Sequence, residues 1–256
     1  MSPLEQQALT AWWTREIGPL SAPLQFEVLA GGQSNPTYRV RSGAQRWVLR
    51  SQPTGKLLAS AHAVDREFRV MQALAHTDVP VPTMVALCMD RSVIGRAFYV
   101  MSFVEGRCFM DPSLPGLSVA ERGAIYAELQ RVAAAIHRVD PLAVGLDGYG
   151  RAENYRTRQL QRWTTQYRAT QTETIESMDR LIDWLERHAP AAASTGLVHG
   201  DLRLDNMLFH PTEPRVLAVI DWELSTLGDP EVDFAYHCMV WRLTSQEFRG
   251  MREHDL

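Results

Sequence analysis

The chain has 256 residues, of which 45% are hydrophobic, so it can bury a substantial core as one large domain or as two lobes that share a cleft. Its formal net charge of -4, without any block of lysines and arginines, argues against a nucleic-acid or membrane-surface partner. The three cysteines lack the spacing of a zinc or redox site, and no signal peptide or membrane span is visible, so we expect a cytoplasmic protein that acts on small molecules.

The chain begins with a helix that we expect to pack on the outside of the first lobe. Residues 4–17 follow an approximate amphipathic pattern, which Gly18 and Pro19 end. The apolar residues that we expect to form its buried face are Leu4, Ala8, Ala11, Trp12 and Ile17.

Short runs of alternating apolar and polar residues then predict an antiparallel sheet. A helix over about 60–76 interrupts these strands, because Val64, Met71 and Leu74 recur at helical spacing. The strands are expected at 26–29, 37–40, 47–50, 84–89 and 97–103.

After Glu105 and Gly106 the pattern changes to long helices. Ser118 and Glu121 have the spacing of a capping box, in which each side chain pairs with an otherwise free backbone amide. Besides the helix that begins at this box, we expect helices over 152–169, 173–188 and 234–241.

Two acidic residues and one amide near the end of the chain have the arrangement of a phosphoryl-transfer site. Asp201 and Asn206 are spaced as D-x-x-x-x-N, and residues 216–220 read as a buried strand that ends at Asp221. Phosphoryl transfer needs a carboxylate that orients the acceptor hydroxyl, and oxygen ligands for magnesium. We assign Asp201 to the first role, and Asn206 and Asp221 to the second.

These residues resemble the catalytic loop of protein kinases. Because Gly200 stands where those enzymes have arginine, the chain is similar to the aminoglycoside phosphotransferase and choline kinase family of small-molecule kinases, and most of all to the kinase-like domain fused to some acyl-CoA dehydrogenases. The resemblance implies an α+β, protein-kinase-like bilobal fold. It implies an antiparallel β-sheet lobe for nucleotide binding over 1–104 and a mainly helical lobe over 105–256, which we expect to be incomplete at its C-terminus.

The resemblance also implies an ATP site between the lobes. Arg50 stands where many kinases have a lysine that contacts the phosphates, with Lys56 as the alternative and Glu67 as the expected ion-pair partner of Arg50. The hinge, with Met101 and Phe103, is expected to contact adenine through backbone atoms. The loop that we expect to cover the phosphates, unless it is a plain hairpin turn, consists of Gly31, Gly32, Gln33, Ser34 and Asn35.

A small hydroxylated acceptor fits the sequence better than a peptide. Only seven residues separate Asp221 from Asp229, too few for the long activation segment on which protein kinases bind peptides. An arginine-rich helix favours an anionic acceptor, such as a hydroxy acid or a hydroxyacyl thioester, over a polycationic aminoglycoside; a solvated basic face is the alternative reading of that helix. The candidate acceptor-binding residues on it are Tyr155, Arg158, Arg162 and Trp163.

Three further residues near the catalytic segment are predicted to have structural roles. We expect His199 to hold the catalytic loop by hydrogen bonds, and Asp229 and Asp233 to cap a helix and brace that loop. Two other functions stay open. The chain could be a nucleotide-binding pseudokinase, because Arg50 replaces the usual lysine, or a metallohydrolase that uses the histidine with the carboxylates.

Overall fold

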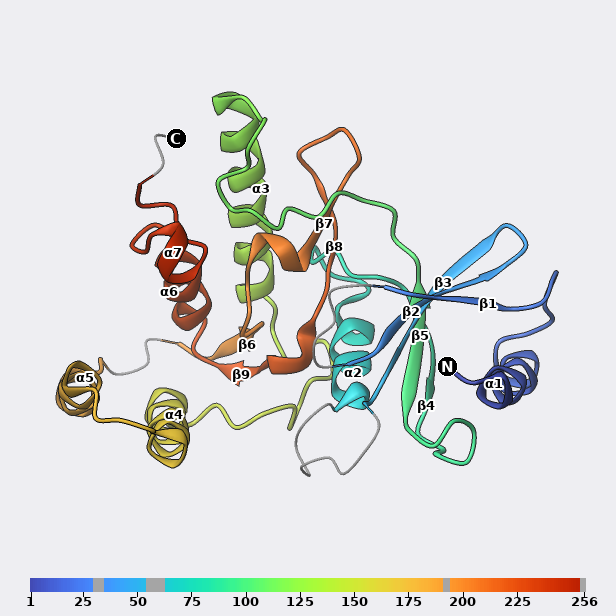
Figure 1. Cartoon of the computed structure of the whole chain (residues 1–256), viewed down its shortest axis with the longest axis horizontal. Coiled ribbons are helices and arrows are strands. Elements are labelled where there is room, and N and C mark those ends of the chain that lie inside the picture. Colours follow the sequence, from blue (N-terminus) through green and yellow to red (C-terminus); the bar gives the residue numbers. More distant parts are fainter. Residues whose placement is uncertain (30–34, 54–62, 191–193, 254–256) are drawn as a thin grey trace.

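A computed structural model of the chain describes residues 1–29, 35–53, 63–190 and 194–253 (Figure 1). Its first lobe is built on a five-stranded sheet with the strand order β1-β2-β3-β5-β4. Every pair of neighbouring strands is antiparallel, as predicted. The strands are β1 (Gln25–Val28), β2 (Thr37–Ser42), β3 (Gln45–Ser51), β4 (Met84–Cys88) and β5 (Phe98–Ser102).

Helix α1 (Pro3–Glu16) packs against the sheet on the outside of the first lobe, as expected (Figure 1). Trp12 and Trp13 make edge-on contacts with aromatic rings of β5 and β3, at centroid distances of 4.8 and 5.0 Å. The expected buried face is wrong at Leu4, which is 77% exposed, and at Ala11, which is also exposed. Leu9 is buried together with the two tryptophans, because these three residues share the helix face that meets the sheet.

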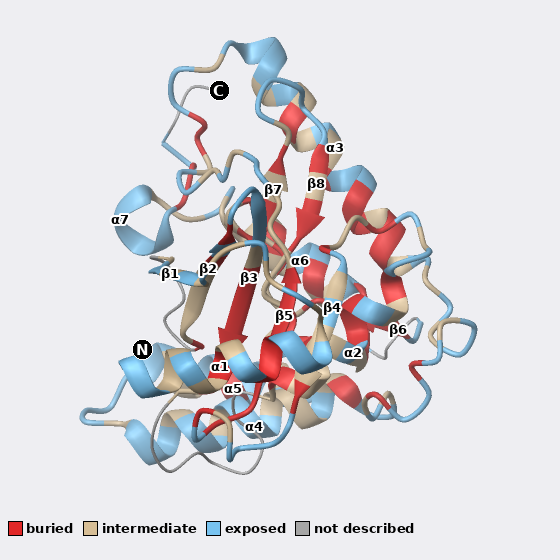
Figure 2. Cartoon of the chain, turned by 90° about the vertical axis from the view of Figure 1, so that its right-hand side faces the viewer, coloured by how far each residue is buried: buried red, intermediate tan, exposed pale blue. Residues whose placement is uncertain are grey.

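Helix α2 (Val64–Leu74) packs on the other side, between the sheet and the helical lobe (Figure 1). Its apolar residues belong to a buried cluster that continues from β3 and β5 into the helical lobe, which Figure 2 shows as red segments. Glu67 lies on the same face and is 0% exposed. The helix therefore carries one carboxylate into the boundary between the lobes.

The second lobe is mainly helical, as predicted. Its longest helix begins with the expected capping box, since Ser118 and Glu121 each pair with the backbone of the other. No helix in the described ranges is both long and apolar enough to cross a membrane. The helices are α3 (Val119–His137), α4 (Tyr155–Thr170), α5 (Glu176–His188), α6 (Glu231–Met239) and α7 (Ser245–Phe248).

Two small antiparallel sheets hold the segments that carry the predicted chemistry. The chain passes from β6 (Gly196–Val198) through residues 199–206 into β7 (Met207–Phe209). It then returns along β8 (Val216–Val219), which pairs with β7, and reaches β9 (Thr226–Gly228), which pairs with β6. Both connecting loops therefore lie at neighbouring strand ends, although most of these short strands were not predicted.

Candidate active site

The catalytic loop brings Asp201 and Asn206 into direct contact. The amide nitrogen of Asn206 donates to the Asp201 carboxylate at 2.9 Å and to the Asp201 carbonyl at 2.8 Å. The amide oxygen of Asn206 is the atom left for another partner. Arg203 forms an ion pair with the Asp201 carboxylate at 3.0 Å, and Asp201 keeps 22% of its side chain exposed. The predicted catalytic carboxylate is thus held in place and accessible.

A buried carboxylate braces this loop from behind. Asp233 of α6 is 1% exposed and accepts hydrogen bonds from the backbone N–H groups of His199 at 2.7 Å and Gly200 at 2.8 Å. Gly200 has φ +86, and a Cβ atom there would lie 2.7 Å from the carbonyl oxygen of Leu224, so the turn requires glycine. The predicted bracing role of Asp233 is confirmed. Asp229 accepts from the backbone of Glu231 at 3.1 Å, as expected of a helix cap.

Replacement of Asp233 by alanine should destabilise the protein. It removes the acceptor of two backbone N–H groups in a buried site, and each unpaired group costs about 1–3 kcal/mol. We expect a loss of about 2–5 kcal/mol in the free energy of unfolding, measured by chemical denaturation. Glu231→Ala, on the exposed side of the same helix, is the control and should cost far less. Equal losses in both variants would contradict the bracing role.

His199 uses both ring nitrogens within the protein. It is fully buried and packs against Trp222 with a centroid distance of 4.6 Å. Nε2 lies 3.0 Å from the Ile220 carbonyl, which can only accept, while Nδ1 accepts from the backbone N–H of Asp201 at 3.2 Å. Burial lowers the pKa of His199 and favours this neutral form. No lone pair remains for a metal ion, which removes the histidine that the metallohydrolase alternative needs.

The second loop places Asp221 beside the catalytic loop. The backbone N–H of Ile220 donates to the carbonyl of Asn206 at 2.9 Å. The two predicted metal ligands, Asn206 and Asp221, therefore lie at adjacent ends of the paired strands β7 and β8. Asp221 has φ +64, and Trp222 after it is 0% exposed, with its indole N–H donated to Val219 at 3.0 Å. This anchoring fixes the segment. An amide oxygen and a carboxylate form a donor set that fits Mg²⁺.

Arg50 connects the sheet lobe to this second loop. Its Nε lies 3.1 Å from Oε2 of Glu67, which confirms the expected ion pair, and its Nη2 lies 2.6 Å from Oδ1 of Asp221. A third carboxylate, Glu223, is 3.5 Å away. Burial raises the pKa of Glu67 to about 7, although Arg50 opposes the shift. Burial alone would lower the pKa of Arg50, but Glu67 and the other acids around it outweigh burial and raise that pKa.

The remaining residues of the expected nucleotide site are placed only in part. Residues 31–34 and Lys56 lie outside the described residues. Asn35 is 0% exposed, and its amide nitrogen donates to Glu223 at 3.2 Å, a contact that sequence reasoning missed. In the expected hinge, Met101 is buried in the main core, and the ring of Phe103 lies under the guanidinium groups of two arginines of the sheet.

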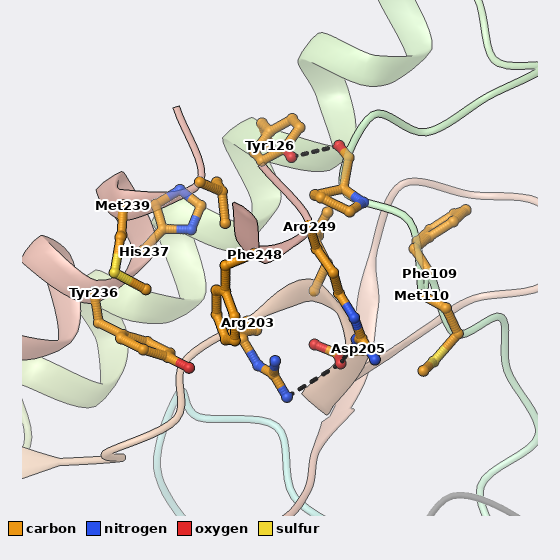
Figure 3. A pocket seen from close by; sticks show the side chains of 13 residues that line it. Phe109, Met110, Tyr126, Arg203, Asp205, Tyr236, His237, Met239, Phe248 and Arg249 are labelled. Carbon is orange, nitrogen blue, oxygen red and sulfur yellow. Dashed lines mark hydrogen bonds and ion pairs between the residues drawn. The ribbon is translucent and has the colours of Figure 1, made fainter. Parts of the chain in front are cut away.

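A cavity that is open to solvent lies beside the catalytic loop (Figure 3). Arg203 and Asp205 of that loop line it, together with Arg249, and its other walls come from the segment 109–112, α3, α6 and α7. Burial and the neighbouring Asp201 raise the pKa of Tyr236 in the cavity wall, so the cavity and the catalytic carboxylate are close. The apolar and aromatic side chains around it include Phe109, Met110, Tyr126, Met239 and Phe248.

The predicted acceptor helix does not line this cavity. Tyr155 is 5% exposed and its ring packs against Gly228. Arg158 donates hydrogen bonds to the backbone carbonyls of Arg151 and Glu153, just before the start of its own helix. Arg162 lies over the ring of Trp163, which is 55% exposed on the outside of α4. No sequence motif indicated the cavity, because its walls come from segments that are far apart in the sequence.

The sheet lobe, the helical lobe and the two loops between them form the kinase-like phosphotransferase fold. Residues 25–255 match the Phosphotransferase enzyme family, and the chain belongs to that family. It is 51% identical over 245 residues to "Acyl-CoA dehydrogenase family member 10" of Mus musculus, covering 95% of this chain but only 22% of that relative's length. The chain thus spans less than a quarter of this curated relative.

Solved structures agree with this assignment. A crystal structure of a presumed aminoglycoside phosphotransferase from Ralstonia eutropha superimposes with a TM-score of 0.87 at 53% identity, covering 97% of this chain and 74% of that one. The streptomycin–ATP ternary complex of APH(2″)-IIa has a TM-score of 0.63 at 17% identity, over 98% of this chain and 86% of that one. At that identity the second likeness shows the fold alone.

Proposed function

We propose that the protein is an ATP- and Mg²⁺-dependent phosphotransferase that moves the γ-phosphoryl group to a hydroxyl of a small molecule. The observation that carries this proposal is the junction of the two loops. There the hydrogen-bonded pair of Asp201 and Asn206 lies next to Asp221, and Asp221 contacts the buried Arg50 of the sheet lobe. Acceptor-orienting, metal-binding and phosphate-binding groups therefore meet between the lobes.

In the proposed reaction, each of these residues has one role. The acceptor oxygen forms a bond to the γ-phosphorus as the bond to the bridging oxygen of ADP breaks, and Asp201 orients the hydroxyl and takes its proton. Asn206 and Asp221 would hold Mg²⁺, which supplies charge neutralisation on the phosphates when it is bound. Arg50 offers a guanidinium whose charge is permanent and whose fork of donors suits phosphate oxygens.

For the acceptor we propose a hydroxy acid or a hydroxyacyl thioester, bound in the cavity of Figure 3. Its mainly apolar and aromatic walls suit an acyl chain, and two arginines line it, with Arg203 at 3.2 Å and Arg249 at 3.0 Å from Asp205. Guanidinium groups in the wall can donate to a carboxylate, so they suit an anionic group better than a polycationic aminoglycoside. The name of the mouse relative, an acyl-CoA dehydrogenase, is consistent with an acyl compound.

Replacement of Arg249 by methionine tests this placement of the acceptor. The variant keeps apolar bulk at the cavity wall but loses one positive charge. We expect KM for an anionic acceptor to rise about tenfold, the equivalent of about 1.4 kcal/mol, with little change in KM for ATP. Steady-state kinetics with each substrate varied in turn measures both. Arg242→Met, at another exposed position, is the control. An unchanged acceptor KM would place the acceptor elsewhere.

A coupled ADP-release screen tests the proposed function itself. The panel contains hydroxy acids, hydroxyacyl thioesters, amino alcohols and aminoglycosides, each with ATP and Mg²⁺. Acceptor-dependent ADP release from at least one class supports a phosphotransferase. Magnesium-dependent ATP binding without release in any class supports the pseudokinase instead. A small-molecule acceptor is the partner that we propose, and a cytoplasmic location stays a prediction.

A further inference from the structure

The three carboxylates around Arg50 form a group that one arginine does not neutralise. Glu67, Asp221 and Glu223 each offer one oxygen, and these oxygens lie within 4.8 Å of one another. The guanidinium of Arg50 contacts all three. Ionised carboxylates at such distances repel one another, so the cluster favours additional positive charge.

Two buried oxygen atoms at this cluster have no hydrogen-bond partner within the described part of the chain. They are Oε1 of Glu67 and Oδ1 of Asn35, both in side chains that are 0% exposed. The amide nitrogen of Asn35 donates to Glu223, which places the unpaired oxygen of the same amide beside the cluster. A buried acceptor without a partner destabilises the folded protein. A cation with oxygen ligands would satisfy such atoms directly.

We infer that Glu67, Asp221 and Glu223 form a divalent-cation site that the Arg50 guanidinium occupies in the nucleotide-free protein. Arg50 then acts as an internal competitor of the metal ion, and its removal creates a site that binds a divalent cation without nucleotide. If the proposed function is correct, the phosphates of ATP draw the guanidinium away from Asp221 as the metal arrives, so that metal and nucleotide bind together.

The geometry shows which contact must change. Nη2 of Arg50 lies 2.6 Å from Oδ1 of Asp221, so it occupies the side of that oxygen that a metal ion would need for coordination. Guanidinium and metal cannot share the oxygen without strong charge repulsion. Nε of Arg50 is held separately by Glu67 at 3.1 Å. The arginine can therefore stay paired with Glu67 while Nη2 exchanges a carboxylate for phosphate oxygens.

Binding of Mn²⁺ alone, without nucleotide, tests this inference. Arg50→Met removes the charge and keeps an unbranched side chain, and Arg46→Met is the matched control, because Arg46 lies on the same strand but pairs with Glu105 at the surface. We measure Mn²⁺ affinity by electron paramagnetic resonance. Arg50→Met should bind Mn²⁺ at least about tenfold more tightly than wild type, and Arg46→Met should match wild type.

A double variant locates the bound ion. Adding Glu223→Gln to Arg50→Met should remove most of the gained affinity, because it takes one ligand charge from the site. A gain that persists in the double variant would overturn the inference, as would wild-type affinity in Arg50→Met. If Arg50→Met does not fold, as judged by circular dichroism, Arg50→Lys replaces it. Lysine keeps the charge but lacks the fork that contacts three carboxylates at once, so Mn²⁺ should still bind more tightly than in wild type.

These results are independent of the proposed phosphotransfer. Mn²⁺ binding is measured without ATP and without an acceptor. A screen in which no acceptor causes ADP release would therefore not contradict the cation site. Equally, phosphoryl transfer by the wild-type protein together with no gain of Mn²⁺ affinity in either Arg50 variant would support the proposed function and contradict the cation site.

Discussion

Replacement of Asp201 by asparagine should lower kcat by about 10²–10⁴-fold, because general acid–base catalysis by a positioned side chain contributes that much. Asparagine keeps the size of the side chain and can still accept from Asn206, but it cannot take a proton. The dissociation constant of Mg·ATP should stay within about twofold of wild type, since Asp201 contacts neither Arg50 nor Asp221 in the described structure. A strongly reduced kcat with unchanged nucleotide binding is the expected result.

Asp78→Asn is a suitable control for this variant. Asp78 is an exposed aspartate in the turn before β4, and the same chemical change there should leave kcat unaltered. Calorimetry gives the nucleotide affinity and the ADP-release assay gives kcat. Wild-type turnover in Asp201→Asn would show that another group orients the acceptor. A large loss of nucleotide affinity would show that Asp201 acts in binding and not in the chemical step.

Replacement of Asp221 by asparagine should have the second large effect. The change removes the anionic member of the proposed metal pair and the 2.6 Å partner of Arg50. We expect kcat to fall by at least about 100-fold, the size of effect seen when one preorganised electrostatic group is lost. In contrast to Asp201→Asn, the Mg²⁺ concentration for half-maximal activity should rise, because a neutral amide binds Mg²⁺ more weakly than a carboxylate.

The dependence of kcat on Mg²⁺ concentration separates the two aspartates. Asp201→Asn should lower the plateau without moving the midpoint, whereas Asp221→Asn should lower the plateau and move the midpoint to higher Mg²⁺. Asp78→Asn should do neither. An Asp221→Asn variant with the wild-type midpoint would contradict its assignment as a metal ligand, whatever its plateau.

The central residues of the site could be predicted from the sequence because they belong to short segments with recognisable patterns. Asp201 and Asn206 are five positions apart in one loop, and an apolar strand delivers Asp221 next to it. The ion pair of Arg50 with Glu67 also followed, since helical spacing places Glu67 on the buried face of α2 and the family resemblance points to Arg50. Such features are fixed by short-range periodicity together with one recognised motif.

Other features depend on contacts that no local pattern specifies. The inward face of α1 was predicted correctly at Trp12 but not at Leu4 or Ala11, because apolar residues occur on more than one side of that helix and the sheet decides which side is buried. The link from Asn35 to Glu223 joins residues 188 positions apart. The cavity is lined by five segments of the chain, so its lining residues can be identified only from the three-dimensional arrangement of the helical lobe. The prediction that α4 binds the acceptor rested only on the arginines and aromatic residues in its sequence.

The most direct test of the account follows the phosphoryl group itself. The protein is incubated with Mg²⁺, an acceptor from the active class and ATP whose γ-phosphoryl oxygens carry ¹⁸O, and the products are analysed by mass spectrometry. We predict that the labelled phosphoryl group appears on the acceptor hydroxyl in wild type and is lost in Asp201→Asn. Bound ATP with no labelled acceptor across the panel, or label found only in inorganic phosphate, would contradict a small-molecule phosphotransferase.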